Sequence, residues 1–140
     1  LTLASPVVYG DAVTIAYTKP STNPLQTAAG GQAESFSARN ITNNVAPPLP
    51  VLVSVVVENA SPSAMVLTYN MSLASIVPAA SAFAVKVNST ARTVSSVAVS
   101  GTKVTLTLAS PVVYGDAVTI AYTKPSTNPL QTAADGQAEP

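Results

Sequence analysis

LTLASPVVYGDAVTIAYTKPSTNPLQTAA, residues 1–29, recurs unchanged as residues 106–134. When the next five residues are added, the two copies match at all but one of 34 positions, Gly30 against Asp135, at a constant offset of 105 residues. A period of this length is too long for one turn of a solenoid and suits one globular domain per repeat. The sequence therefore predicts a tandem array, of which the 140 residues cover one repeat and a third.

The composition restricts the class of protein. Hydrophobic residues make up 47% of the chain and charged residues only 9%, against roughly 25% charged residues in typical soluble domains. Such a chain is too apolar to be disordered, and its Ser-, Thr-, Asn- and Ala-rich surface suits a secreted structural protein. The net charge is zero and no basic stripe is present, so we expect no nucleic-acid partner. The longest apolar run, residues 51–57, is far shorter than the ~20 residues of a membrane helix, so we expect no membrane insertion.

Alternation of apolar and polar residues predicts β-strands along most of the repeat. Residues 104–108 alternate Val, Leu and Leu with two Thr, and residues 13–18 alternate in the same way, as in half-buried strands. The Pro-rich turn with Gly-Asp between two such strands predicts a hairpin in each copy, with residues 1–3 as its first strand in copy one. Further strands are expected at residues 34–42, 52–58, 64–70, 83–87 and 93–99. We expect residues 52–58 to be buried on both faces, and Ser95 and Ser96 to form a bulge.

About seven short strands per 105-residue repeat, separated by turn signals, predict an all-β fold. Their number and spacing are typical of an immunoglobulin-like Greek-key β-sandwich. We expect residues 1–44 to be the C-terminal part of one repeat, with its closing hairpin and last strand. Residues 45–50 would be a Pro-rich linker, and residues 51–140 the following repeat without its last strand.

Several motifs resemble those of a known repeat family. They are AMVLTY at 64–69, PAASAFAV at 78–85, VAVSG at 97–101, VTLTLA at 104–109, GD at 115–116, YT at 122–123 and QTAA at 131–134. Their types and order are similar to those of the SwmB-type (swimming-motility protein) tandem repeat over the whole unit. The resemblance implies immunoglobulin-like tandem domains of giant, adhesin-like cell-surface or filament proteins, with no enzymatic activity in the repeat. Family members often carry Asp after the Gln, where this sequence has Thr27 and Thr132, which weakens any inference of a calcium site.

The residue inventory excludes most catalytic chemistry. The chain contains no His and no Cys, which excludes Ser-His-Asp triads, Cys-His pairs and the usual zinc or copper ligand sets. Two alternatives remain: a carboxylate dyad, or a calcium site built from Asp116 with Asp135 or Glu139. The simpler interpretation, which we favour, is that these carboxylates lie solvated in turns. We therefore expect a protein that is not an enzyme and needs no cofactor.

Four Asn-X-Ser/Thr sequons begin at Asn40, Asn59, Asn70 and Asn88. In a eukaryotic source they would be candidate sites for covalently attached glycans. Asn59 is the poorest candidate because Pro62 follows its sequon, and coincidence in a Ser/Thr-rich chain is the alternative for all four.

The two parts of the chain lack complementary strands, which predicts strand donation. The strand at residues 34–42, with Glu34, Phe36, Ala38 and Ile41, could complete the sheet of another molecule, or the chain could close on itself. If the protein continues beyond Pro140, each unit would instead be completed in sequence, as a covalent stalk.

We therefore expect a structural repeat of an extracellular, cell-surface protein or filament, whose partners are copies of itself or neighbouring repeats. The alternative is an adhesin module that binds carbohydrate or a host surface through loops such as residues 19–31.

Overall fold

The computed structural model describes all 140 residues, which divide into two units, Leu1–Ala46 and Pro47–Pro140. Apart from one turn of 3₁₀ helix, η1 at Ala80–Ala82, the regular structure in both units consists of β-strands. The predicted all-β fold class is confirmed.

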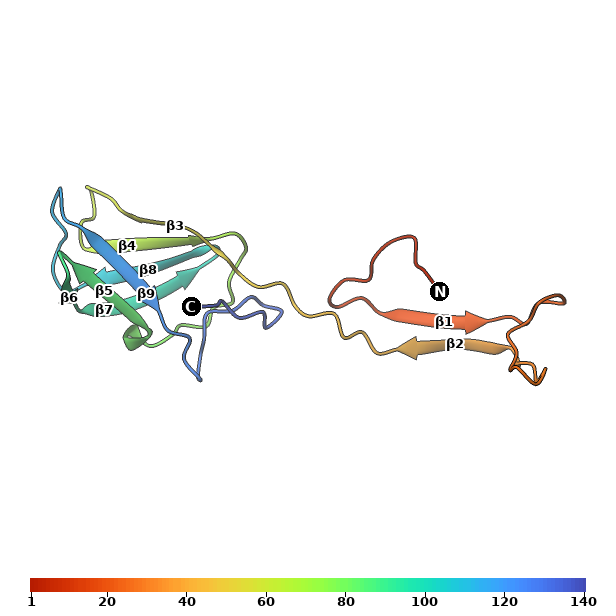
Figure 1. The fold of residues 1–140 in the computed structure, drawn as a ribbon. Coiled ribbons are helices and arrows are strands. Elements are labelled where there is room, and N and C mark those ends of the chain that lie inside the picture. Colours follow the sequence, from red (N-terminus) through yellow and green to blue (C-terminus); the bar gives the residue numbers. More distant parts are fainter. The chain divides into compact units, whose positions relative to one another are not determined.

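Two antiparallel sheets make up the Pro47–Pro140 unit (Figure 1). The first sheet has the order β3-β4-β8-β7 and the second has the order β6-β5-β9. This order parallels the ABED and CFG sheets of immunoglobulin domains, with no strand at the position of G beside β9. The strands are β3 (Leu52–Val57), β4 (Ala64–Tyr69), β5 (Phe83–Val87), β6 (Thr90–Arg92), β7 (Val94–Ser100), β8 (Lys103–Leu108) and β9 (Val118–Tyr122).

The core of this unit lies between the two sheets. Because side chains alternate between the faces of a strand, every second residue of β4, β5 and β8 is buried. The long loop after β9 adds two further side chains that are fully buried, Leu130 and Ala138. The largest fully buried side chains are Met65, Leu67, Val85, Val104, Leu106 and Leu130.

The predicted hairpin between residues 104–108 and 118–122 is wrong. β8 pairs with β4 and β7, whereas β9 pairs with β5 in the other sheet. The segment between β8 and β9 therefore crosses from one sheet to the other. Residues 1–3, the counterpart of part of β8, form no strand, because the Leu1–Ala46 unit has no segment equivalent to β4 or β7. Alternation identifies a strand but says nothing about which strand lies beside it.

Two further expectations concern the burial of β3 and a bulge in β7. β3 was expected to be buried on both faces, but it is an edge strand with Val53 65% exposed, so this expectation is wrong. The bulge is confirmed, since the register of β7 against β8 shifts between Val94 and Ser96. The short strand β6 was not predicted.

The Leu1–Ala46 unit contains a single strand pair. β1 (Val13–Tyr17) and β2 (Phe36–Ile41) are antiparallel, and β2 lies where a strand was expected within residues 34–42. No residue of this unit is buried. An isolated two-stranded pair is at best marginally stable in water, so this unit gains little from tertiary packing.

The repeated sequence keeps its local structure in both units but differs in burial. The Tyr17 hydroxyl accepts a hydrogen bond from the Leu25 amide at 2.9 Å, and the Tyr122 hydroxyl accepts one from the Leu130 amide at 3.0 Å. Leu25 is nevertheless 61% exposed, whereas Leu130 is completely buried. The loop conformation is therefore encoded locally, while its burial depends on the strands from Leu52 to Ser100.

The linker packs against the loop after β9 within the Pro47–Pro140 unit. A side chain at Gly136 would overlap the carbonyl oxygen of Pro48. At Gly31, the same position of the first copy, the nearest atom to an added Cβ is Thr27 Oγ1 at 3.3 Å. Gly136 thus allows the close approach that holds the start of this repeat against its end.

The duplicated leucine provides a matched pair of variants. We expect Leu130→Ala to lower the unfolding free energy of the Pro47–Pro140 unit by about 2–5 kcal/mol, because it leaves a cavity in the core. Leu25→Ala, in the same local sequence, should change it by no more than about 0.5 kcal/mol. Chemical denaturation of both variants measures the difference, and equal losses would contradict this account of the core.

Candidate strand-docking site

β9 is an edge strand with one open side. It pairs with β5 on one side only. Its core-facing side chains, Val118, Ile120 and Tyr122, pack against the core but remain only half-buried. An unpaired edge with an apolar inner face is a template for another strand.

The hydrogen-bonding pattern identifies which backbone groups of β9 are open. The Thr123 amide donates to the Ala82 carbonyl and the Ala117 carbonyl accepts from the Asn88 amide, both at 2.8 Å and both toward the β5 side. In an antiparallel strand, successive residues direct their backbone amide and carbonyl groups to alternate sides. The amide and carbonyl groups of Val118, Ile120 and Tyr122 therefore point to the open side.

In the first copy, β2 occupies the corresponding side of β1. The Lys19 amide, two residues after Tyr17 and therefore on the same side of the strand, donates to Ser35 Oγ at 2.9 Å, just before β2. Tyr17 lies opposite Phe36, with ring centroids 6.0 Å apart, and Val13 lies opposite Ile41. β1 and β9 have the same sequence, VTIAY, yet only β1 has a strand on this side.

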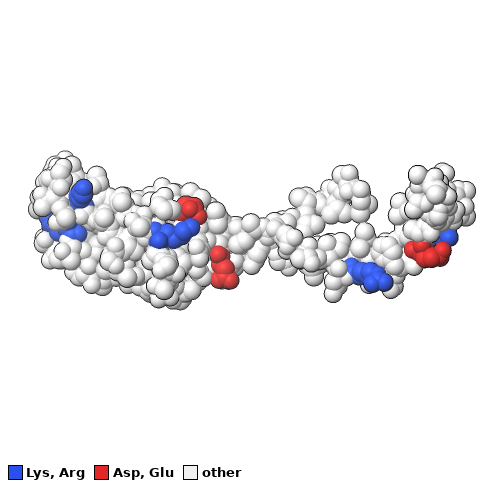
Figure 2. Space-filling view, turned by 60° about the horizontal axis from the view of Figure 1, so that its bottom comes forward, with Lys and Arg blue, Asp and Glu red and all other residues white.

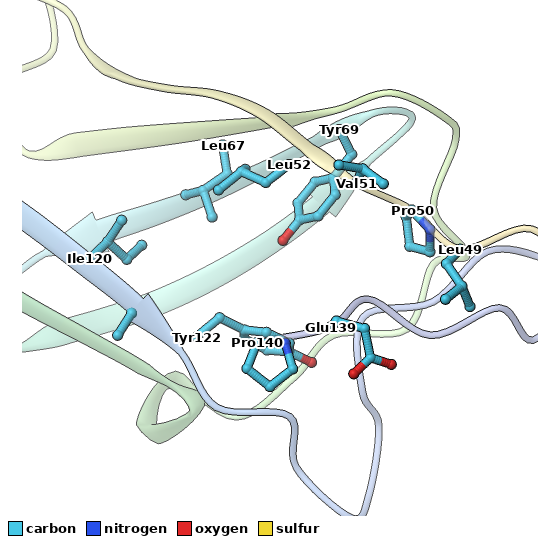
Figure 3. Close-up of a pocket in the computed structure, with 11 residues that line it drawn as sticks. Leu49, Pro50, Val51, Leu52, Leu67, Tyr69, Ile120, Tyr122, Glu139 and Pro140 are labelled. Atoms are coloured by element: carbon cyan, nitrogen blue, oxygen red, sulfur yellow. The ribbon is translucent and has the colours of Figure 1, made fainter.

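A groove runs along the open side of β9, between β9 and β3. Its wider part is a cavity of about 660 Å³ beside Ile120 and Tyr122, and its narrower part, about 300 Å³, lies beside Val118 and Ile120. Figure 3 shows the Tyr69 hydroxyl pointing into the wider part, with Leu52 above it and Pro140 below. The wider part is lined by Leu49, Pro50, Val51, Leu52, Leu67, Tyr69, Ile120, Ala121, Tyr122, Glu139 and Pro140.

The pKa values of two tyrosines in the groove, Tyr69 and Tyr122, are raised. Burial of the Tyr69 phenol, followed by the nearby Tyr122, raises the pKa of Tyr69 to about 12. Burial also raises the pKa of Tyr122, whose ring centroid lies 5.2 Å from that of Phe83. Both phenols are thus neutral at physiological pH, so the groove presents aromatic and aliphatic surface.

Charged groups are few and scattered. Figure 2 shows a few charged side chains, some of them beside one of opposite sign, on an otherwise uncharged face. The Asp116 carboxylate accepts hydrogen bonds from the Val113 amide and the Asn88 side chain. These bonds hold the pKa of Asp116 below its usual range, and the bond from Val113 has the larger effect. Glu139 pairs with Lys124 at 3.1 Å. No three carboxylates come together anywhere in the structure, and Asp116, Asp135 and Glu139 each have a different partner.

The residues expected to donate a strand are found in and beside β2. Phe36, Ala38 and Ile41 lie on β2, while Glu34 lies before it and pairs with Lys19 at 3.2 Å. Phe36 and Ile41 lie opposite Tyr17 and Val13, whose counterparts in β9 face the core, whereas Ala38 falls in the irregular part of the register. The sequence did not indicate that the linker and Tyr69 would line the groove, because neither carries a motif.

The sequon asparagines are all exposed, but their amides differ. The Asn88 amide is engaged at both ends: its nitrogen donates to Asp116 at 2.7 Å and its oxygen accepts from the Ala117 amide at 2.9 Å. Asn70 uses only its oxygen, which accepts from the Val51 amide at 2.8 Å. Asn40 lies on β2, and Asn59 lies in the turn before β4. Glycosylation at all four stays a prediction, with Asn88 the least available.

The fold and the duplicated sequence define a class, the repeat with an all-β sandwich fold. A comparison with known families matched residues 43–127, more than half of the chain, to the SWM repeat, described as "Putative flagellar system-associated repeat". The chain belongs to this repeat family, as the sequence motifs predicted. Searches of curated proteins and of solved structures each found no match. No helix of the structure has the length and apolar character needed to cross a membrane.

The raised pKa of Tyr69 predicts a loss of stability at alkaline pH. Because folding raises this pKa from 10.0 to about 12, the folded state holds the proton longer than the unfolded state. The stabilisation is complete below pH 10 and is lost as the pH rises toward 12. We expect Tyr69→Phe to flatten this decline in denaturation experiments between pH 9 and 12, leaving the smaller contribution of Tyr122. An unchanged slope would show that Tyr69 is not protected by burial.

Proposed function

We propose that this chain is a structural, non-catalytic repeat of an extracellular surface protein or filament, whose units join by tandem packing and by strand donation between neighbouring units. The observation that carries the proposal is the contrast between two identical strands: β1 is covered by β2, whereas β9 has an open side above an apolar groove. Membership of a tandem repeat family and the sparsely charged surface support the same function.

The free energy of strand donation depends on an exchange of backbone hydrogen bonds and on the burial of apolar side chains, which must exceed the cost of association. Moving β2 from β1 to the β9 of another molecule exchanges one set of backbone hydrogen bonds for an equivalent set, because the two strands have the same sequence. The surplus comes from burying Phe36 and Ile41 in the groove, roughly 1.5–3 kcal/mol for each side chain that becomes fully buried. Each molecule has one donor and one acceptor at different places, so the contact is heterologous and would extend into a filament.

A change at Phe36 tests this function. We expect native mass measurements and negative-stain images over a hundredfold concentration range to show growth into filaments for the unmodified chain. Phe36→Asp should abolish growth, because a carboxylate would have to enter the apolar groove. Asn40→Asp is the matched control, since it places the same charge on β2 opposite Thr14 rather than opposite a core-facing residue. A monomer at every concentration would contradict donation and leave a covalently continuous stalk.

An adhesin module is the second candidate, and one exposed feature favours it. Tyr114 is fully exposed beside Val113, which is 64% exposed, at the tip of the turn between β8 and β9. The Asp116 carboxylate holds this turn by accepting the Val113 amide at 2.9 Å. The expected loops at residues 19–31 and 124–136 contain no aromatic residue, so this tip is the better contact for a sugar ring or a host surface.

Binding to a glycan array would test the adhesin candidate. Tyr9, the counterpart of Tyr114 in the first copy, is 43% exposed and forms a second tip. We expect a chain with Tyr9→Ala and Tyr114→Ala to lose at least about tenfold in affinity for any glycan that the unmodified chain binds, since each tip supplies an aromatic face. The control carries Tyr69→Phe, which leaves both tips intact. Absence of binding by the unmodified chain, or binding that survives in the double variant, would contradict this role for the tips.

A further inference from the structure

We infer that the groove between β9 and β3 is a receptor for residues Phe36–Ile41 of a second copy of this chain, with the Phe36 ring seated beside Tyr69 and Tyr122. This inference rests on the proposed function and specifies the occupant, its register and the pocket that selects it.

The register follows from the duplicated strand. In the first copy, Phe36 lies opposite Tyr17 and Ile41 lies opposite Val13. With the offset of 105 residues, the same segment on the open side of β9 places Phe36 opposite Tyr122 and Ile41 opposite Val118. The backbone groups needed for this pairing are those that β9 directs away from β5.

The two parts of the groove match the two apolar side chains of the segment. The wider part, about 660 Å³, lies at the Tyr122 end, where the larger Phe36 side chain would enter, and Figure 3 shows the Tyr69 and Tyr122 side chains on either side of it. The narrower part, about 300 Å³, lies at the Val118 end, where Ile41 would meet Val55 and Val57. A register shifted by one residue would direct polar side chains into both parts.

The charges of groove and segment are complementary. The charged residues that line the groove are both acidic: Asp116 in the narrower part, and Glu139 in the wider part, where it also pairs with Lys124 at 3.1 Å. The only charged residue of the segment is Arg39, which in this register lies opposite Ile120, between the two. Its apolar stem can cover Ile120 while the guanidinium reaches the rim of the groove.

A second copy is the proposed occupant because it carries the segment that covers the identical strand β1. Within one chain, β2 lies on β1 and the side of β9 remains open. With the offset of 105 residues, Pro140 corresponds to Ser35, the residue just before Phe36. A hexapeptide appended after Pro140 therefore enters the groove directly and competes with a second copy.

This competition provides the experiment. One extended chain carries Phe-Ser-Ala-Arg-Asn-Ile after Pro140, and its matched control carries Asp-Ser-Ala-Arg-Asn-Ile. We expect the first extension to raise the Tm of the Pro47–Pro140 unit by at least about 5 °C and to abolish concentration-dependent growth. The second extension should do neither, because it cannot fill the wider part of the groove.

The outcomes separate this inference from the proposed function. If the unmodified chain grows into filaments and the first extension changes neither growth nor Tm, assembly stands and the groove is not the receptor. If the unmodified chain stays monomeric at every concentration, a second copy is not the occupant, whatever the extension does to Tm. Growth that only the first extension suppresses, together with the rise in Tm, supports the segment, its register and the second copy.

Discussion

Burial of two apolar sheet faces against each other is the constraint on which the Pro47–Pro140 unit depends. With few charges and no disulfide, this unit depends mainly on such packing. The duplicated sequence isolates the effect, because the same loop has a leucine buried completely at Leu130 and largely exposed at Leu25. Local hydrogen bonds form the loop in both places, but only the opposing sheet removes the side chain from water.

The packing is complete at the central strands of the sandwich and open along the edge strands β3 and β9. β4 and β8 are central strands with neighbours on both sides, and their inward residues are fully buried. β3 and β9 each have one neighbour, and their inward residues are only half-buried. The groove lies where these two edge strands face each other, so incomplete burial and the open edge occur together.

Sequence patterns predicted the structural features that depend on residues close together in the chain. Alternation located β4, β5, β8 and β9, and the paired serines located the bulge in β7. The family motifs identified the repeat. At positions 27 and 132, threonine hydroxyls accept the amides of Gly31 and Gly136 at 3.1 Å, so a hydroxyl closes this turn in both copies. Each of these hydrogen bonds joins residues only four positions apart, so it depends on one short segment of the sequence.

Features that depend on partners distant in the sequence were not predictable. β8 and β9 are consecutive strands with a turn between them, but they lie in different sheets, because each finds its neighbours among earlier strands. β3 is as apolar as a central strand, yet it lies at an edge. The wall that Leu49 and Tyr69 contribute to the groove exists only once the linker and β4 have come together.

In the arrangement that we propose, the acceptor and not the covalent connection would fix the register of a completing strand. The hydrogen-bonding groups of β9 would set which residues pair, and the unequal parts of the groove would set which side chain enters at each end. A strand of the Phe36–Ile41 type therefore meets the same surface whether it follows in the chain or comes from another molecule. Covalent and non-covalent arrays would share one interface between units, and they would differ under load, since release of a strand disconnects only the non-covalent array.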